Sequence, residues 1–269
     1  MVWSCLVSIL PGMAQTEKLT DYVNPFVGTD GYGNVYPGAQ IPFGGIQISP
    51  DTDSRFYDAA SGYKYNHLTL MGFSLTHLSG TGIPDLGDFL FIPGTGEMKL
   101  EPGTHEDPDQ GYRSRYSHDK EWASPNYYAV ELADYGVKAE MTSGVRSGMF
   151  RFTYPESDNA FIMIDMNHTL WQSCEWSNLR MINDSTITGY KLVKGWGPER
   201  HVYFTATFSK KLTGLRFVQD KKPVIYNTSR FCSSYEAWGK NLMACISFDT
   251  KAGEEVTVKT AISAVSTDG

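Results

Sequence analysis

Apolar and polar residues alternate along much of the second half of the chain. In residues 137–141 (VKAEM), for example, every other side chain is apolar, and a turn signal at Asp134, Tyr135 and Gly136 precedes this run. Such alternation places one face of a strand on a core and the other in solvent. The pattern predicts strands over residues 127–132, 137–141, 149–154, 160–166, 186–193, 201–208, 215–219, 242–248 and 255–262.

Short strands in this number, joined by short links and without long helical patterns, are typical of two packed antiparallel sheets. We therefore predict an all-β fold, a large two-sheet antiparallel β-sandwich, as one domain over residues 20–269. The chain of 269 residues is long for one domain. All-β sandwiches nevertheless reach about 200–250 residues as single domains.

The first half of the chain has a different pattern. Residues 24–108 are dense in glycine, proline, aspartate and aromatic residues, which predicts short strands and long loops. Polar loops on a rigid sandwich are where binding sites usually lie. We therefore expect the functional residues in this half.

The N-terminus carries an apolar segment. Residues 1–15 contain no charge, and the apolar run 2–10 is followed by Pro11, Gly12 and Ala14. This order is typical of the apolar region and cleavage zone of an export signal, although the basic start is absent. We predict an export signal over 1–15 and a secreted or periplasmic location for an exported bacterial protein; a buried N-terminal strand is the alternative. No stretch is long enough to span a membrane.

The charge and the cysteine content argue against several classes of protein. A net charge of −7 lacks the basic footprint of proteins that bind nucleic acid. Cys5 would leave with the signal, and Cys174, Cys232 and Cys245 show neither a CxxC pair nor a metal-ligand spacing. One disulfide at most is expected, with at least one buried free thiol.

Aromatic residues make up 13% of the chain. Tyrosine and tryptophan favour strands, and both also suit surfaces that stack on sugars. Core packing is the preferred interpretation for each tryptophan. The exceptions that we expect are Trp171 and Trp176, which flank Cys174 in a polar, loop-like stretch. The tryptophans that a stacking platform would draw on are Trp122, Trp171, Trp176, Trp196 and Trp238.

Three stretches of the first half concentrate unusual residues, but standard motifs are missing from them. The glycine-rich run 28–33 has no P-loop lysine, and Pro37 and Pro42 prevent an immediate helix, which argues against nucleotide binding. Neither an EF-hand loop nor HExxH is present, so we assign no metal ligand. Ser79 does not lie in a GxSxG context, which argues against a serine nucleophile.

A pair of carboxylates remains as the catalytic option. Glycoside hydrolysis uses one protonated and one ionised carboxyl group on either side of the scissile bond. Asp51, Asp85, Asp88 and Glu97 are available in this segment. Loop aspartates more often accept backbone hydrogen bonds at turns, which is the preferred interpretation for each of them.

Taken together, these stretches resemble the N-terminal domain of glycoside hydrolase family 92, the calcium-dependent exo-acting α-mannosidases. The residues that carry the resemblance are VNPFVGTDGYGNVYPGAQIPFG (23–44), QISPDT (47–52), SGYKY (61–65) and GFSLTHLSGTGIPDLGD (72–88). Similar stretches continue through residues 116–142, 189–196, 201–209 and 247–266. The resemblance therefore covers nearly the whole chain after residue 22.

The resemblance implies a two-domain enzyme in which a β-sandwich is followed by an (α/α)6 barrel. It implies hydrolysis of terminal α-linked mannose, with α-1,2 linkages expected, with inversion, and in glycans such as N-glycans. The general acid, the general base and most of the Ca2+ site belong to the barrel in this family. No catalytic residue is therefore assigned to this chain, and we expect it to be inactive alone.

The partners implied are a mannose-containing glycan and the (α/α)6 domain. We expect substrate contacts from polar residues in loops whose glycines let the backbone approach a ligand. These candidates are Thr29, Asp30, Asp51, His77, Thr81, Asp85 and Asp88. Two alternatives remain: a stand-alone carbohydrate-binding β-sandwich, and a scaffold that only docks a helical domain.

Overall fold

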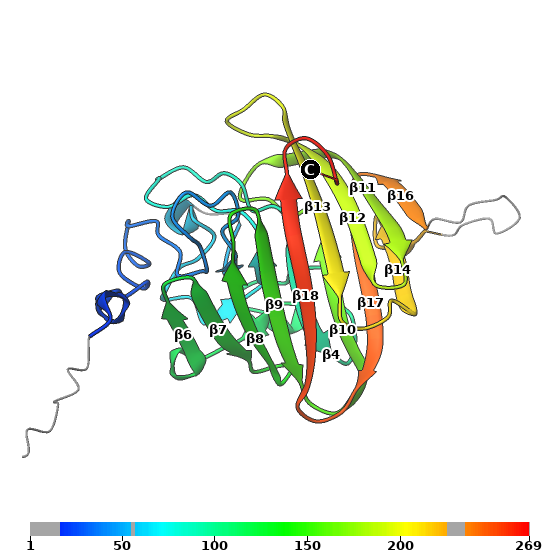
Figure 1. Cartoon of the computed structure of the whole chain (residues 1–269), viewed down its shortest axis with the longest axis horizontal. Coiled ribbons are helices and arrows are strands. Elements are labelled where there is room, and N and C mark those ends of the chain that lie inside the picture. Colours follow the sequence, from blue (N-terminus) through cyan, green and yellow to red (C-terminus); the bar gives the residue numbers. More distant parts are fainter. Residues whose placement is uncertain (1–16, 55–56, 225–234, 269) are drawn as a thin grey trace, which may run out of the picture.

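The fold is built almost entirely from antiparallel strands that form two large sheets (Figure 1). The computed structural model describes residues 17–54, 57–224 and 235–268, so the predicted export signal lies outside the described residues, as does Cys232. The all-β sandwich prediction is confirmed. No helix among the described residues is both long and apolar enough to cross a membrane.

The larger sheet has nine strands in the order β16-β11-β12-β13-β18-β9-β8-β7-β6. The last strand of the chain, β18, therefore lies in its centre, hydrogen-bonded to β13 on one side and β9 on the other. The bounds are β6 Glu121–Ser124, β7 Tyr127–Leu132, β8 Val137–Ser143, β9 Ser147–Tyr154, β11 Ser173–Asn183, β12 Thr186–Lys194, β13 Arg200–Phe208, β16 Glu236–Gly239 and β18 Glu254–Ser263.

The smaller sheet has seven strands in the order β1-β3-β4-β10-β17-β14-β15. Its bounds are β1 Ser49–Asp51, β3 Gly72–Ser74, β4 Leu90–Thr95, β10 Ser157–Asp165, β14 Gly214–Gln219, β15 Lys222–Pro223 and β17 Leu242–Thr250. A separate pair joins β2 Thr69–Leu70 to β5 Ser114–Arg115. The short 3-10 helices are η1 Leu19–Tyr22, η2 Tyr57–Ala59, η3 Pro108–Gln110 and η4 His118–Lys120.

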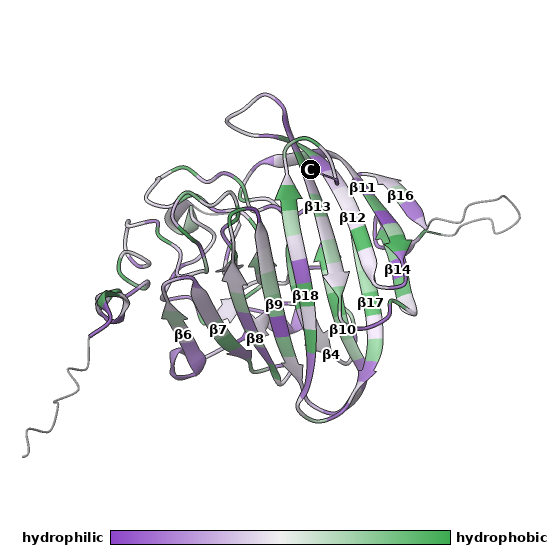
Figure 2. Cartoon of the chain, viewed as in Figure 1, coloured by the Kyte–Doolittle hydropathy of each residue, from purple (hydrophilic) through white to green (hydrophobic). Residues whose placement is uncertain are grey.

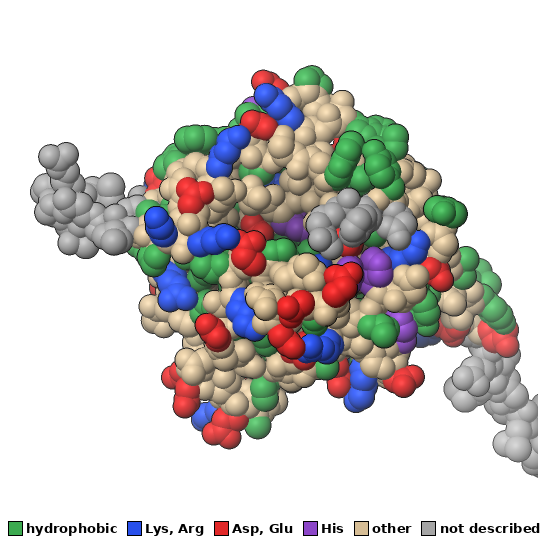
Figure 3. All heavy atoms as spheres, turned by 180° about the vertical axis from the view of Figure 1, so that it is seen from behind, with side chains coloured by type: hydrophobic (Ala, Val, Ile, Leu, Met, Phe, Trp, Pro, Cys, Tyr) green, Lys and Arg blue, Asp and Glu red, His purple; other side chains and the backbone are tan. Residues whose placement is uncertain are grey.

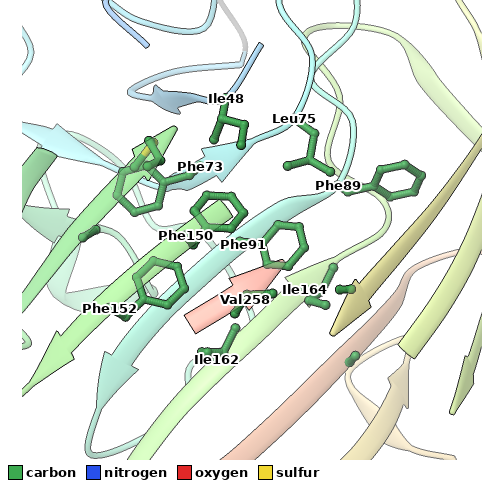
Figure 4. Packing of buried hydrophobic residues seen from close by; sticks show 14 of the residues in the cluster. Ile48, Phe73, Leu75, Phe89, Phe91, Phe150, Phe152, Ile162, Ile164 and Val258 are labelled. Carbon is green, nitrogen blue, oxygen red and sulfur yellow. The ribbon is translucent and has the colours of Figure 1, made fainter. Parts of the chain in front are cut away.

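Apolar side chains from both sheets meet in one core between them (Figure 4). Phe91 and Ile162 of the seven-stranded sheet point toward Phe150 and Val258 of the nine-stranded sheet. The rings of Phe91 and Phe150 lie 4.9 Å apart between centroids, within the range of favourable aromatic pairs. Figure 2 shows the alternation of apolar and polar positions along the strands that produces this core.

The sequence pattern missed three strands of the nine-stranded sheet, β6, β11 and β16. Strand β11 is eleven residues long, but bulges between Cys174 and Trp176 and between Met181 and Asn183 interrupt its alternation. The description of Trp176 as part of a loop is therefore wrong. A bulge adds one residue to a strand and shifts the side-chain period, which hides the strand from an alternation test.

Core packing is also the wrong assignment for the tryptophans. The five that the structure describes, Trp122, Trp171, Trp176, Trp196 and Trp238, are all between 43% and 60% exposed. Their aromatic partners in the core are phenylalanine and tyrosine instead. Of the thiols, Cys174 and Cys245 are buried and free, as predicted for at least one.

Candidate functional site

The centre of the candidate site is the carboxylate of Asp51, the last residue of edge strand β1. One carboxylate oxygen lies 2.8 Å from Nε2 of His77, and the other lies 2.8 Å from Nε2 of His168. His77 follows β3, and His168 follows β10 of the same sheet. Asp51 therefore joins two loops at one end of the seven-stranded sheet.

The second ring nitrogen of His77 also has a hydrogen-bond partner. Its Nδ1 lies 2.7 Å from the carbonyl oxygen of Gln47, which can only accept a hydrogen bond. His77 is thus held between a carbonyl oxygen and a carboxylate, which fixes the ring orientation. Gly62 allows this close packing, because a Cβ there would lie 2.1 Å from the Asp51 carboxylate.

Asp51 is ionised in this arrangement. Burial by itself would raise the pKa of its carboxyl group, but electrostatic attraction and hydrogen bonds from His77 and His168 hold that pKa well below its ordinary value. The side chains of Asp51 and His77 have no exposed surface. The trio is therefore a buried, charge-compensated junction, and only His168 reaches a pocket directly.

Asp88 forms a second buried network nearby. Its carboxylate lies 3.1 Å from Nζ of the fully buried Lys191, contacts the guanidinium of Arg200 and accepts a hydrogen bond of 2.7 Å from Thr76. Lys191 also donates to the carbonyl oxygen of His168, which connects the two networks. Burial would raise the pKa of Asp88, whereas Lys191 and Arg200 lower it below its ordinary range. Asp88 is therefore a structural anchor with its oxygens fully engaged.

A large pocket lies beside this junction. It has a volume of about 910 Å3 and is bordered by His168, Asp165, Asn167, Trp171 and Gln172. Figure 3 shows the face opposite to that of Figure 1, where histidine side chains lie near the centre among acidic and basic groups. A pocket of this volume can hold one or a few sugar rings.

An aromatic pair stands at the pocket. Trp171 is 55% exposed, and its ring packs against that of Tyr57 at 5.5 Å between centroids. The backbone of Trp171 has φ +77°, a left-handed conformation that a bulky residue adopts only under strain. Strain of this kind gathers at ligand-binding sites, where the fold holds one side chain in place.

Two polar side chains, Asp165 and Gln172, border the pocket. Burial raises the pKa of the Asp165 carboxyl group, although the nearby His168 partly opposes this. Gln172 donates from its amide nitrogen to the carbonyl oxygen of Pro84, while its Oε1 is buried without a protein partner. An acceptor without a partner and an aromatic face are the groups that a sugar hydroxyl and a sugar ring require.

The predicted substrate-binding residues do not form one site. Only Asp51 and His77 are in direct contact, and Asp88 belongs to the second network. The carboxylate of Asp85 accepts hydrogen bonds from the backbone N–H groups of Leu86 and Trp196. Asp85 therefore has the turn-capping role that is usual for a loop aspartate. The hydroxyl of buried Thr29 donates to the carbonyl oxygen of Phe26, that of Thr81 donates to the carbonyl oxygen of Ile83, and Asp30 is exposed.

Sequence reasoning missed Asp165, His168 and Gln172. They follow the buried run 160–164 of β10, at the point where that strand leaves the sheet. A group of polar residues directly after a strongly apolar strand was the available signal. The expectation of functional residues rested on the glycine-rich first half, and His168 lies 117 residues beyond its partner Asp51 along the chain.

Comparison with known proteins identifies the chain. Residues 22–263 match the glycosyl hydrolase family 92 N-terminal domain. A protein of Arthroderma benhamiae described as an uncharacterized secreted glycosidase is 30% identical over 139 residues, which are 51% of this chain and 17% of that protein.

Two solved structures are similar over most of the chain. One is the family 92 glycosyl hydrolase ccman5, with a TM-score of 0.76 and 26% identity over 93% of this chain. The other is a family 92 inverting mannosidase of Bacteroides thetaiotaomicron, with a TM-score of 0.75 and 24% identity over 94% of this chain. The chain spans 33% of the length of each of these relatives.

Proposed function

Because this chain belongs to glycosyl hydrolase family 92, as its N-terminal domain, we propose that it forms one wall of the sugar pocket of a secreted exo-α-mannosidase. The full enzyme would remove terminal α-linked mannose, with α-1,2 linkages preferred, from glycans such as N-glycans. The hydrolysis would proceed with inversion. The observation that carries the proposal is the pocket beside the Asp51–His168 contact, with Trp171 at its border.

The pocket residues suit recognition of a neutral sugar. Trp171 offers a flat apolar face on which the C–H side of a pyranose ring can stack. Asn167 and Gln172 bring side-chain amides, which can exchange hydrogen bonds with sugar hydroxyls, to the same wall. His168, fixed by Asp51, gives that wall a rigid support.

The chemistry itself is assigned to the second domain. An inverting hydrolase needs two carboxyl groups about 6.5–9.5 Å apart with a water molecule between them. Asp51 and Asp88 are ionised and engaged with basic side chains, so neither is free to transfer a proton. In this proposal the chain binds and orients mannose, while the general acid and base come from the (α/α)6 barrel.

The acidic loops of this chain do not fit a calcium site. Asp51 faces two histidines, and Asp88 faces Lys191 and Arg200, which leaves no oxygen of these carboxylates for a cation. Within residues 17–54, 57–224 and 235–268, no three acidic, histidine or cysteine side chains cluster closely enough to hold a metal ion. We propose that the family's Ca2+ is held by the second domain, and no step is derived through it.

The first loops offer a docking surface for that domain. Tyr32 and Phe43 are more than 90% exposed, and Leu19, Tyr22 and Val27 are at least 70% exposed. Large apolar side chains gathered in one segment mark a surface that another protein part covers. Docking of the barrel here would place it beside the N-terminal loops.

The proposal is tested by two measurements on the 269-residue chain. Incubation with α-1,2-mannobiose should release no mannose, because the acid and base are absent. Titration calorimetry should detect weak mannose binding that Trp171→Ala abolishes and that Trp122→Ala, on the far edge strand β6, leaves unchanged. Mannose release at ordinary enzyme rates would contradict the assignment of the chemistry, and equal binding by Trp171→Ala would contradict the pocket.

A stand-alone carbohydrate-binding function is the second candidate. The half-exposed tryptophans favour it, since none of the five is used in the core. It predicts useful glycan affinity without a second domain. The wall proposal predicts that affinity for mannose rises sharply when the second domain is present.

A further inference from the structure

A row of aromatic side chains crosses the outer face of the nine-stranded sheet, away from the pocket. The strand register places Trp238 of β16 opposite Asn178 of β11, Asn178 opposite Tyr190 of β12, and Tyr190 opposite Tyr203 of β13. The residues on either side of these aromatics along their strands are buried. Because side chains alternate between the faces of a strand, the row points outward.

A second row runs beside the first. Trp176 of β11 lies opposite Leu192 of β12, and Leu192 lies opposite His201 of β13. The two rows together define the aromatic face, whose members are Trp176, Tyr190, His201, Tyr203 and Trp238. The four strands that carry it lie side by side in Figure 1.

Internal contacts hold the middle of the aromatic face in place. The rings of Tyr190 and Tyr203 lie 4.8 Å apart between centroids, and the hydroxyl of Tyr190 is 3.0 Å from Nδ1 of His201. Trp176 and Trp238 flank this group and are 46% and 55% exposed. The rings of Tyr190, Tyr203 and His201 are therefore held in place before any ligand arrives, which lowers the entropy that binding must overcome.

The charge around the aromatic face is balanced. Lys240 pairs with Glu175 at 3.2 Å, and Glu236 lies opposite Arg180 in the strand register. Each ring of the face also carries a polar atom, and Leu192 is the aliphatic side chain within the two rows. A surface of amphipathic rings without net charge matches a neutral sugar chain, whose rings have apolar faces and hydroxyl edges.

A groove continues from the aromatic face across the same sheet. It has a volume of about 490 Å3 and is lined mostly by hydroxyl-bearing and short residues, among them Ser147, Thr205 and Thr207, together with Met149 and Lys259. Thr205 is two residues from Tyr203 along β13, so the groove adjoins the aromatic rows. Hydroxyls along a groove can exchange hydrogen bonds with those of a sugar chain.

We propose that the aromatic face and its groove bind an extended neutral oligosaccharide, apart from the pocket that receives the terminal sugar. The ligand class rests on the proposed function, because a glycan-degrading protein meets long sugar chains. The surface would hold the body of the glycan while its ends are processed elsewhere. Binding at a second site increases the time that the enzyme spends on one polymer.

The test uses native affinity electrophoresis of the 269-residue chain in gels with and without soluble yeast α-mannan. The Trp176→Ala/Trp238→Ala double variant should bind mannan about tenfold more weakly than the unmodified chain. Trp122→Ala serves as the matched control, because Trp122 is also about half exposed and lies on β6 at the opposite edge of the same sheet. This control should migrate like the unmodified chain.

The outcomes separate the proposal from its rivals and from the pocket. Equal retardation of the double variant and the unmodified chain would overturn it, as would the absence of retardation of the unmodified chain by mannan. If the unmodified chain and the Trp122→Ala control form dimers but the double variant does not, the face is an interface between copies of the chain and the proposal is wrong. Trp171→Ala should keep its mannan retardation, so failure of the pocket proposal would leave this result unaffected. Far-UV circular dichroism confirms that each variant is folded.

Discussion

The carboxylate of Asp51 lies 2.8 Å from Nε2 of His168, a residue 117 positions further along the chain. This contact fastens the loop after β10 to edge strand β1 and so fixes one wall of the pocket beside His168. A single buried charge thereby couples the stability of the sheet end to the shape of the site.

Asp51→Asn is expected to lower the free energy of unfolding by about 3 kcal/mol. The amide replaces one acceptor oxygen by a donor, which then faces a histidine nitrogen instead of accepting from it. Urea unfolding measures the change. The exposed Asp30→Asn should alter stability by less than about 0.5 kcal/mol, and equal effects of the two variants would contradict the importance of the junction.

Stability should fall in acid because of Asp51 and Asp88. Burial opposes ionisation of both, but His77 and His168 beside Asp51, and Lys191 and Arg200 beside Asp88, hold each pKa below its ordinary value in the folded protein. Below about pH 4 the unfolded chain therefore binds protons that the folded protein does not, and the free energy of unfolding decreases. Their contribution is fully present at neutral pH.

Melting temperatures measured between about pH 2 and pH 7 should show this loss of stability in acid. The Asp51→Asn variant should show a flatter decline than the unmodified chain, because one of the two carboxylates no longer titrates. An unmodified chain with the same melting temperature at about pH 3 and about pH 7 would rule out this linkage.

Gly62→Ala should disturb the junction through direct contact. A Cβ there would lie 2.1 Å from Oδ1 of Asp51, and the residue also has φ +87°. We expect a loss of about 2–4 kcal/mol in the free energy of unfolding, together with weaker mannose binding. Calorimetric melting and titration measure the two effects.

Gly80→Ala is the matched control for this variant. Gly80 has a similar φ of +76° but no atom within 4 Å of an added Cβ. It should lose only the backbone component, about 1–2 kcal/mol, and keep its mannose affinity. If the two alanine variants unfold alike, the contact with Asp51 has no consequence.

Trp171→Gly should separate stability from binding. The left-handed backbone at Trp171 suits glycine, so the variant should be as stable as the unmodified chain or up to about 1 kcal/mol more stable. Mannose binding should nevertheless fall, because the ring that lines the pocket is lost. Urea unfolding and titration calorimetry check the two parts. A clear loss of stability would show that the ring supports the fold.

Much of the fold followed from the sequence because strand alternation is a local property. The runs at 127–132 and 160–166 correspond to β7 and most of β10 without knowledge of their neighbours. Strand β11 was hidden by its bulges, and the exposed tryptophans were misassigned because apolar composition does not reveal which face of a strand carries a ring.

The site was less predictable because it depends on pairing between distant segments. Asp51 and His77 were chosen from their polar character in glycine-rich loops, and the structure brings them together. Nothing in the local sequence linked them to His168, since that contact requires β10 to lie near β1 in the sheet. Asp88, like Asp51, is an aspartate of the first half of the chain, but its ion pair with buried Lys191 makes it a structural anchor.

The central position of β18 has a consequence for the newly made protein. Residues 147–154 and 200–208 can hydrogen-bond to β18 only after residues 254–263 have left the ribosome. Until then the nine-stranded sheet remains as two separate halves with open edges. This domain can therefore complete its larger sheet only after residues 254–263 have been synthesised, and the open strand edges stay available to chaperones until then.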